Sequence, residues 1–91
     1  MSSILSSREK KIILSIIRSS HGITLQEVSV EVGVSRRTVL REISTVYKWF
    51  EKRGYTVERH SSKGLHLVIS EHDKKLLLEE LPKFPERDFQ I

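Results

Sequence analysis

The chain has 91 residues, 16 Lys plus Arg, 12 Asp plus Glu and no cysteine, which gives a formal net charge of +4. This length suits one small domain, so we do not expect two domains, and large enzyme folds are excluded. The absence of cysteine excludes disulfide bonds and thiolate zinc sites. Aliphatic runs are far shorter than the ~20 residues that cross a bilayer, and no secretory signal is visible, so we expect a cytoplasmic protein without a membrane partner.

The positive charge is concentrated in the middle of the sequence. Residues 35–63 contain eight basic and three acidic side chains, whereas residues 64–91 contain four basic and six acidic ones. Such a concentration within a folded segment is typical of proteins that bind a phosphate backbone, and an ordinary solvated face is the alternative interpretation.

The first expected element is a helix over about 7–20. Ser6 followed by Glu9 matches a capping box, in which each residue bonds the backbone N–H of the other, and apolar residues follow at helical spacing. Ile23 then falls in a short extended connection.

A second helix and a tight turn come next. Thr24 followed by Glu27 is another capping box, and Gly33 is placed to end the helix that it opens. Glycine permits the positive φ that lets a following helix leave at a steep angle. Ser29 is small, as two helices that meet through a short turn require.

The longest expected element is a helix that begins after its N-cap Ser35 and runs to Arg53. Gly54 is placed to end it. At 100° per residue, its core-facing stripe spans about 60° and consists of Val39, Ile43, Val46 and Phe50. The residues at about 140–200° from Val39 form the opposite face, and they are Arg37, Arg41, Ser44 and Lys48. Because that face has no acidic residue, nucleic-acid binding explains it better than solubility does, and arginine matches the paired acceptors of guanine in the major groove.

A hairpin and a last helix complete the expected elements. Residues 55–60 and 65–69 are rich in strand formers with apolar residues at period two, and the turn 61–64 between them is polar and basic. Ser70 then caps a helix that Pro82 ends.

This order of elements predicts a mainly α fold with a small β-hairpin, namely a winged helix-turn-helix with a three-helix core, a wing and an extra C-terminal helix. We assign residues 1–70 to a winged helix-turn-helix DNA-binding domain. Residues 71–91 are assigned to a C-terminal helix and a linker toward an absent regulatory region. Surplus leucines in the last helix, together with the two-fold symmetry of operators, lead us to expect a homodimer.

The segment 34–43, VSRRTVLREI, resembles the recognition-helix core of winged helix-turn-helix regulators. More narrowly, it resembles the N-terminal domain of phosphotransferase-system-regulated sugar-operon activators of the mannitol and lichenan operon type. The segment 63–67, KGLHL, is similar to the family's wing, although Leu65 stands where an aromatic residue is common. The resemblance covers about residues 6–70. It implies a bacterial transcriptional regulator of carbohydrate uptake or utilisation, in which absent downstream domains contact phosphotransferase-system proteins.

The resemblance also implies roles for single residues. Arg37 and Arg41 are the expected base readers, whereas Ser35 and Thr38 are expected to hold phosphates at the helix start. Lys63, with Arg59 and Ser62 nearby, matches the wing that lies along the DNA backbone or in the minor groove. The full set of expected DNA-binding residues is Ser35, Arg36, Arg37, Thr38, Arg41, Ser44, Lys48, Arg59, Ser62 and Lys63.

Other chemistry-bearing residues are expected to be structural. The spacing of the four histidines does not place three metal ligands together, so neither a metal nor a cofactor is expected, and His60 is interpreted as an exposed strand residue. Tyr47 and Trp49 are expected to pack against the first helix or the hairpin instead of stacking on bases. No serine has a recognisable histidine and acid partner, so we expect no enzyme activity.

The main hypothesis is therefore sequence-specific binding of double-stranded operator DNA. Two alternatives remain: a winged-helix module that binds another protein, and the regulatory domain of a biotin-ligase-like repressor. The operator sequence, the inducing sugar and the choice between activation and repression do not follow from the residues.

Overall fold

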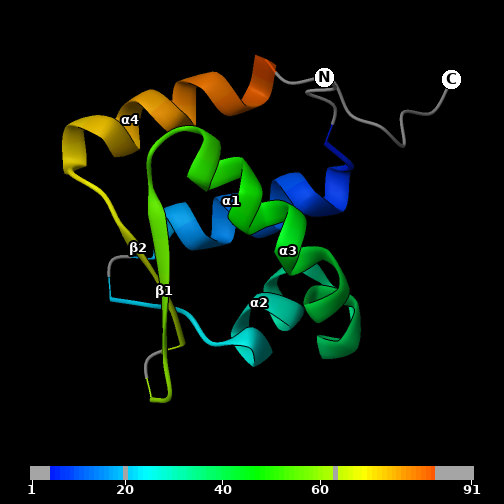
Figure 1. Cartoon of the computed structure of the whole chain (residues 1–91). Coiled ribbons are helices and arrows are strands. Elements are labelled where there is room, and N and C mark those ends of the chain that lie inside the picture. The colour runs from blue at the N-terminus through cyan, green and yellow to red at the C-terminus, as the bar shows by residue number, and fades with distance from the viewer. Residues whose placement is uncertain (1–4, 20, 63, 84–91) are drawn as a thin grey trace, which may run out of the picture.

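The computed structural model describes residues 5–19, 21–62 and 64–83 and is mainly helical with one antiparallel hairpin (Figure 1). Its elements are α1 (Ser7–Arg18), α2 (Leu25–Val32), α3 (Arg36–Lys52), β1 (Thr56–His60), β2 (Gly64–Val68), α4 (Glu71–Glu80) and a 3-10 turn (Leu81–Lys83). Lys63 and the expected linker around Pro85 lie outside the described residues. Within the described part of the chain, no helix combines the length and the apolar character that crossing a membrane requires.

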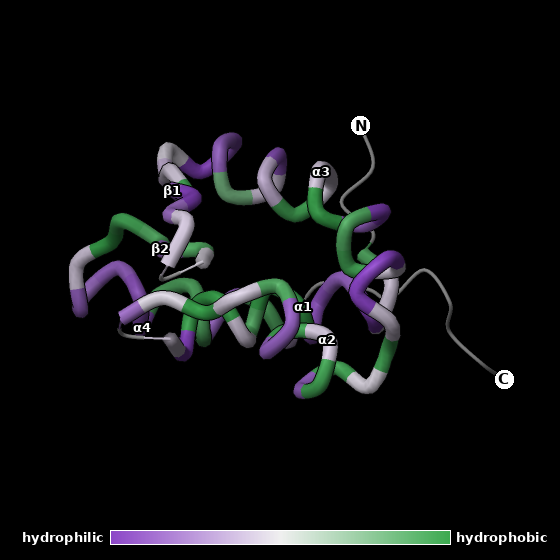
Figure 2. Tube along the Cα trace, turned by 90° about the horizontal axis from the view of Figure 1, so that it is seen from below, coloured by the Kyte–Doolittle hydropathy of each residue, from purple (hydrophilic) through white to green (hydrophobic). Residues whose placement is uncertain are grey.

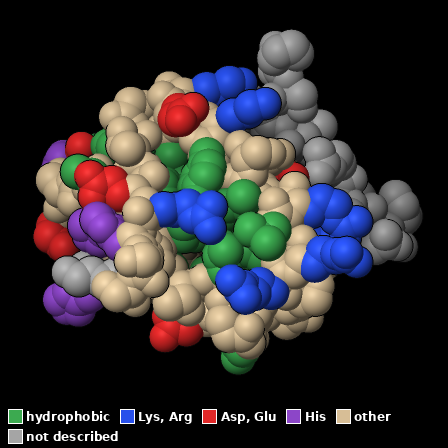
Figure 3. All heavy atoms as spheres, turned by 60° about the horizontal axis from the view of Figure 1, so that its bottom comes forward, with side chains coloured by type: hydrophobic (Ala, Val, Ile, Leu, Met, Phe, Trp, Pro, Cys, Tyr) green, Lys and Arg blue, Asp and Glu red, His purple; other side chains and the backbone are tan. Residues whose placement is uncertain are grey.

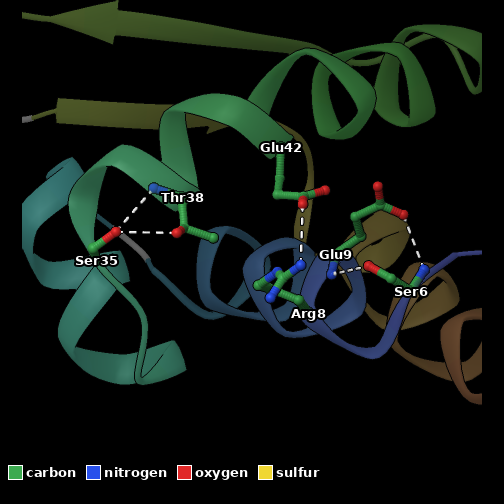
Figure 4. A network of polar contacts seen from close by, with 6 residues as sticks. All are labelled: Ser6, Arg8, Glu9, Ser35, Thr38 and Glu42. Atoms are coloured by element: carbon green, nitrogen blue, oxygen red, sulfur yellow. Dashed lines mark hydrogen bonds and ion pairs between the residues drawn. The ribbon is translucent and has the colours of Figure 1, made fainter. Parts of the chain in front are cut away.

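Side-chain caps define where the helices begin, as the sequence predicts. Ser6 Oγ accepts the backbone N–H of Glu9 at 3.0 Å, and a Glu9 carboxylate oxygen accepts the Ser6 N–H at 2.9 Å (Figure 4). The reciprocal pair between Thr24 and Glu27 opens α2 in the same way. Each box satisfies donors that a helix N-terminus otherwise leaves unbonded.

The helix ends differ slightly from expectation. Helix α1 stops at Arg18, two residues before the predicted end, because Ser19 has extended backbone angles and its hydroxyl accepts the N–H of Gly22. Helix α4 gives way to the 3-10 turn one residue before Pro82, which has no N–H to continue the helix.

The hydrophobic core lies where α1, α2, α3, α4 and the inner face of the hairpin meet. The stripe predicted on α3 is fully or almost fully buried, and Trp49 joins it at 5% exposure. Figure 2 shows hydrophobic and hydrophilic residues alternating along α3, as expected for a helix with one buried side. Tyr47 packs against this core, which confirms the structural interpretation of both aromatic residues.

The hairpin is anchored to the helical body by a short third segment. Ile23 forms an antiparallel bridge with Leu65, with N···O distances of 2.9 and 2.7 Å. Gly64 lies against this segment, and a Cβ at Gly64 would come within 2.5 Å of the Thr24 Cα. The connection expected at Ile23 therefore fixes the start of β2, at the turn end of the hairpin, next to the start of α2.

Helix α4 packs against α1 and buries Leu77, and Leu81 of the 3-10 turn that follows is buried too. A polar contact joins α4 to the end of α3. The Arg53 guanidinium donates to the Glu80 carboxylate, with a shortest distance of 2.8 Å, and it lies 4.0 Å above the Trp49 ring. A further N–H of Arg53 donates to the Trp49 carbonyl oxygen at 3.2 Å. This arrangement combines a charge-assisted pair with a cation–π contact.

Replacing Arg53 by alanine is expected to lower the free energy of unfolding by about 1–2 kcal/mol, because the stacking and the hydrogen bonds are lost together. The measurement is the urea concentration at the midpoint of unfolding, with the dependence of the free energy on urea concentration unchanged. Lys52→Ala removes the same charge from the neighbouring exposed position and is expected to change stability by less than about 0.5 kcal/mol. Equal effects of the two substitutions would show that the contact contributes nothing beyond charge.

Candidate nucleic-acid interface

Helix α3 presents a continuous basic surface on the side opposite its buried stripe. The residues predicted for this surface are all exposed to solvent: Arg37, Arg41, Ser44 and Lys48. Arg36, expected to contact DNA from the start of the helix, is exposed as well. Among the described residues, no ion pair or hydrogen bond engages the side chains of the four cations. Their charges are consequently not neutralised by acidic groups of the described fold.

The start of α3 is held by the residues expected to contact phosphate. Ser35 Oγ accepts the backbone N–H of Thr38 at 3.2 Å, and the two hydroxyl oxygens are 3.0 Å apart (Figure 4). Ser35 is thus the N-cap that the sequence predicts, and its hydroxyl is engaged within the helix. The N–H groups of Arg36 and Arg37 belong to the first turn, where a helix has no internal acceptors and favours an anion.

The turn between α2 and α3 sets the direction in which this helix leaves. Gly33 has φ of +83°, and its N–H and that of Val34 both donate to the Ser29 carbonyl oxygen, at 2.9 and 3.0 Å. Ser29 is 4% exposed, and its hydroxyl donates to the carbonyl oxygen of Gln26. The small buried side chain and the positive φ are the two steric features that the sequence predicts at this turn.

Glu42, an acidic residue of α3, is directed away from the basic surface. Glu42 accepts from Arg8 of α1 at 3.4 Å, so its charge faces the other helix (Figure 4). Figure 3 shows the face formed by the lower part of Figure 1, where Lys and Arg side chains surround hydrophobic ones and the acidic groups lie nearer the margins. The exposed apolar residues Val30 and Leu40 belong to α2 and α3.

The hairpin adds a further cation beside the start of α3. Arg59 is exposed and lines a hollow of about 460 Å³ together with Arg36, which places cations from two elements around one space. Thr24 and Gln26, at the start of α2, line the same hollow. Ser62 is exposed at the turn of the hairpin, and Lys63 lies outside the described residues.

Tyr47 lies near Arg59 of the hairpin. Burial raises the pKa of the Tyr47 hydroxyl above its usual value, and the nearby Arg59 guanidinium partly opposes that increase. The hydroxyl therefore stays protonated at neutral pH, and no phenolate neutralises Arg59. A phosphate oxygen is a chemically suitable partner for this guanidinium.

Sequence reasoning did not identify the start of α2 as part of this surface. The capping box locates the N-terminus of α2, but the bridge between Ile23 and Leu65 brings it next to the hairpin. That bridge joins residues far apart in the chain, and no local pattern predicts it. Gln26, exposed in the first turn of α2, is the polar side chain missed in this way.

Searches against known protein families, curated proteins and solved structures found no match to this chain.

Proposed function

We propose that this chain is a winged helix-turn-helix domain that binds double-stranded DNA, with α3 as the recognition helix and the hairpin as the wing. The main support is the row of exposed cations on α3, which faces away from the core and forms no ion pair with the residues that the structure describes. A single α-helix fits the major groove, which is about 12 Å wide, and arginine can donate two hydrogen bonds to guanine there.

Each element has a distinct part in this proposal. Arg37 and Arg41 read base edges, whereas the first-turn N–H groups of α3 and the Ser35–Thr38 pair hold phosphates. Arg36 and Arg59 converge on one hollow, which suits a backbone phosphate between α3 and the wing. Lys48 and Ser44 extend the contact along the groove. Lys63 is proposed as a further backbone contact at the hairpin turn.

The biological setting follows from the resemblance stated above and is part of the proposal. The domain is proposed to belong to a cytoplasmic bacterial regulator of carbohydrate genes that binds a two-fold operator as a homodimer. Regulation through phosphotransferase-system proteins is assigned to further domains. No catalytic role is proposed.

The direct test is a titration of the whole chain against a short mixed-sequence DNA duplex at increasing salt. Binding is expected at low salt, with a slope of log K against log salt of about −3 to −5, because each neutralised phosphate contributes roughly −0.9. Absence of binding at low salt would contradict the proposal and favour a protein partner. The same strand without its complement is the control, and a shallower slope of about −0.7 per phosphate is expected for it.

A further inference from the structure

Two histidines and a glutamate come together on the outer face of the hairpin. The register pairs Glu58 of β1 directly with His66 of β2, and His60 follows Glu58 by two residues on the same face. The potential ligand atoms of all three side chains lie within 4.8 Å of one another. The spacing of the histidines in the chain does not reveal Glu58 as the third group, because only the strand register places it opposite His66.

The hairpin backbone fixes this arrangement. Leu65 and Leu67 of β2 are buried against the helices, so His66 between them must face outward. Its cross-strand partner Glu58 lies on the same outer face. Glu58 and His60 are exposed and His66 is half-buried. Histidine and acidic side chains lie side by side at the left of Figure 3.

The spacing is close to that of ligands on a single metal ion. Zn²⁺ binds imidazole nitrogen and carboxylate oxygen at about 2.0–2.2 Å, so two ligand atoms on one ion are roughly 3–3.5 Å apart. His60 Nε2 and Glu58 Oε1 are already 3.1 Å apart. The rings of His60 and His66 have centroids 6.3 Å apart and are inclined by 53°. Glu58 and His60 are exposed, so rotation about their χ angles can bring their ligand atoms closer to His66.

We propose that Glu58, His60 and His66 form a Zn²⁺ site that links the two strands of the hairpin. Imidazole suits a borderline ion such as Zn²⁺, whereas Mg²⁺ and Ca²⁺ prefer ligands made only of oxygen. Three protein ligands leave one tetrahedral position for water. A bound ion cross-links β1 to β2 and stabilises the folded state by mass action.

A simple ion pair between Glu58 and His60 is the competing explanation, and it does not involve His66. The decisive variant is therefore His66→Gln, because the ion-pair explanation predicts no change and the metal site loses one of its three ligands. His60→Gln, at an exposed position, is a second variant that does not depend on packing of the strand. His72→Gln removes an exposed histidine from α4 and serves as the matched control.

The experiment is calorimetric titration of ZnCl₂ into the tag-free whole chain, with thermal unfolding followed in parallel. Wild type and His72→Gln are expected to bind one equivalent of Zn²⁺ and to gain thermal stability. His66→Gln and His60→Gln are expected to bind at least about tenfold more weakly, since even a group that only supports a metal ligand contributes roughly 10–100-fold. Equal binding by all four proteins, no saturable binding by wild type, or equal binding of MgCl₂ would overturn the proposal. No DNA is needed, so this result is independent of the proposed DNA-binding function.

Discussion

Replacing Arg37 or Arg41 by alanine is expected to weaken binding to the preferred DNA site by about 1–3 kcal/mol each and to relax base choice at the contacted positions. Both guanidinium groups are exposed and free of ion pairs among the described residues, so each substitution removes a DNA contact without exposing a buried partner. The measurement is fluorescence anisotropy at constant salt, with the tightest duplex selected from a random-sequence pool.

Lys75→Ala is the matched control for that experiment. Lys75 is an exposed cation on α4, at the opposite end of the fold from the hairpin tip and the first turns of α3 (Figure 1). The Lys75→Ala substitution removes the same charge but no proposed DNA contact, so the affinity for DNA is expected to change by less than about twofold at moderate salt. If both arginine variants bind as Lys75→Ala does, α3 is not the reading surface.

Replacing Gly64 by alanine is expected to destabilise the fold by about 2–4 kcal/mol. Gly64 has φ of +81°, and an added Cβ would meet the carbonyl oxygen of Ile23 and lie 2.5 Å from the Thr24 Cα. Both neighbouring atoms belong to the backbone, so relief requires the hairpin to move away from the start of α2. The change is measured as the shift in the midpoint of chemical unfolding.

Gly54→Ala separates the close contact from the backbone conformation. Gly54 has φ of +84°, but no heavy atom lies within 4 Å of its added Cβ. This variant is expected to lower the free energy of unfolding by about 1–2 kcal/mol, the cost of placing a residue other than glycine in a left-handed conformation. A Gly64 variant no less stable than the Gly54 variant would show that the start of β2 is not closely packed against Ile23 and Thr24.

Local patterns in the sequence were sufficient to predict most of the secondary structure. The capping boxes at Ser6 and Thr24 and the N-cap at Ser35 are local because each joins groups three residues apart. Strand β1 begins one residue later than predicted, and β2 begins and ends one residue earlier. The earlier start of β2 arises because Gly64 pairs with His60 within the ladder. The buried stripe of α3 was predictable because helical periodicity alone separates it from the basic surface.

Features that depend on long-range pairing were not predictable in the same way. The Arg53–Glu80 contact requires α4 to fold back on α3, and the strand register alone brings His66 opposite Glu58. The hollow shared by Arg36 and Arg59 depends on how the hairpin is attached at Ile23. Each of these contacts joins segments whose separation in the chain gives no periodic signal.

Mapping of backbone amide shifts by NMR, during titration of the whole chain with duplex DNA, tests the central claim most directly. We predict that the largest shifts fall in the first half of α3, at the start of α2 and in the hairpin near Arg59, and that α4 is unaffected. Shifts confined to α1 and α4, with α3 unchanged at saturating DNA, would contradict the assignment of α3 as the DNA-binding surface.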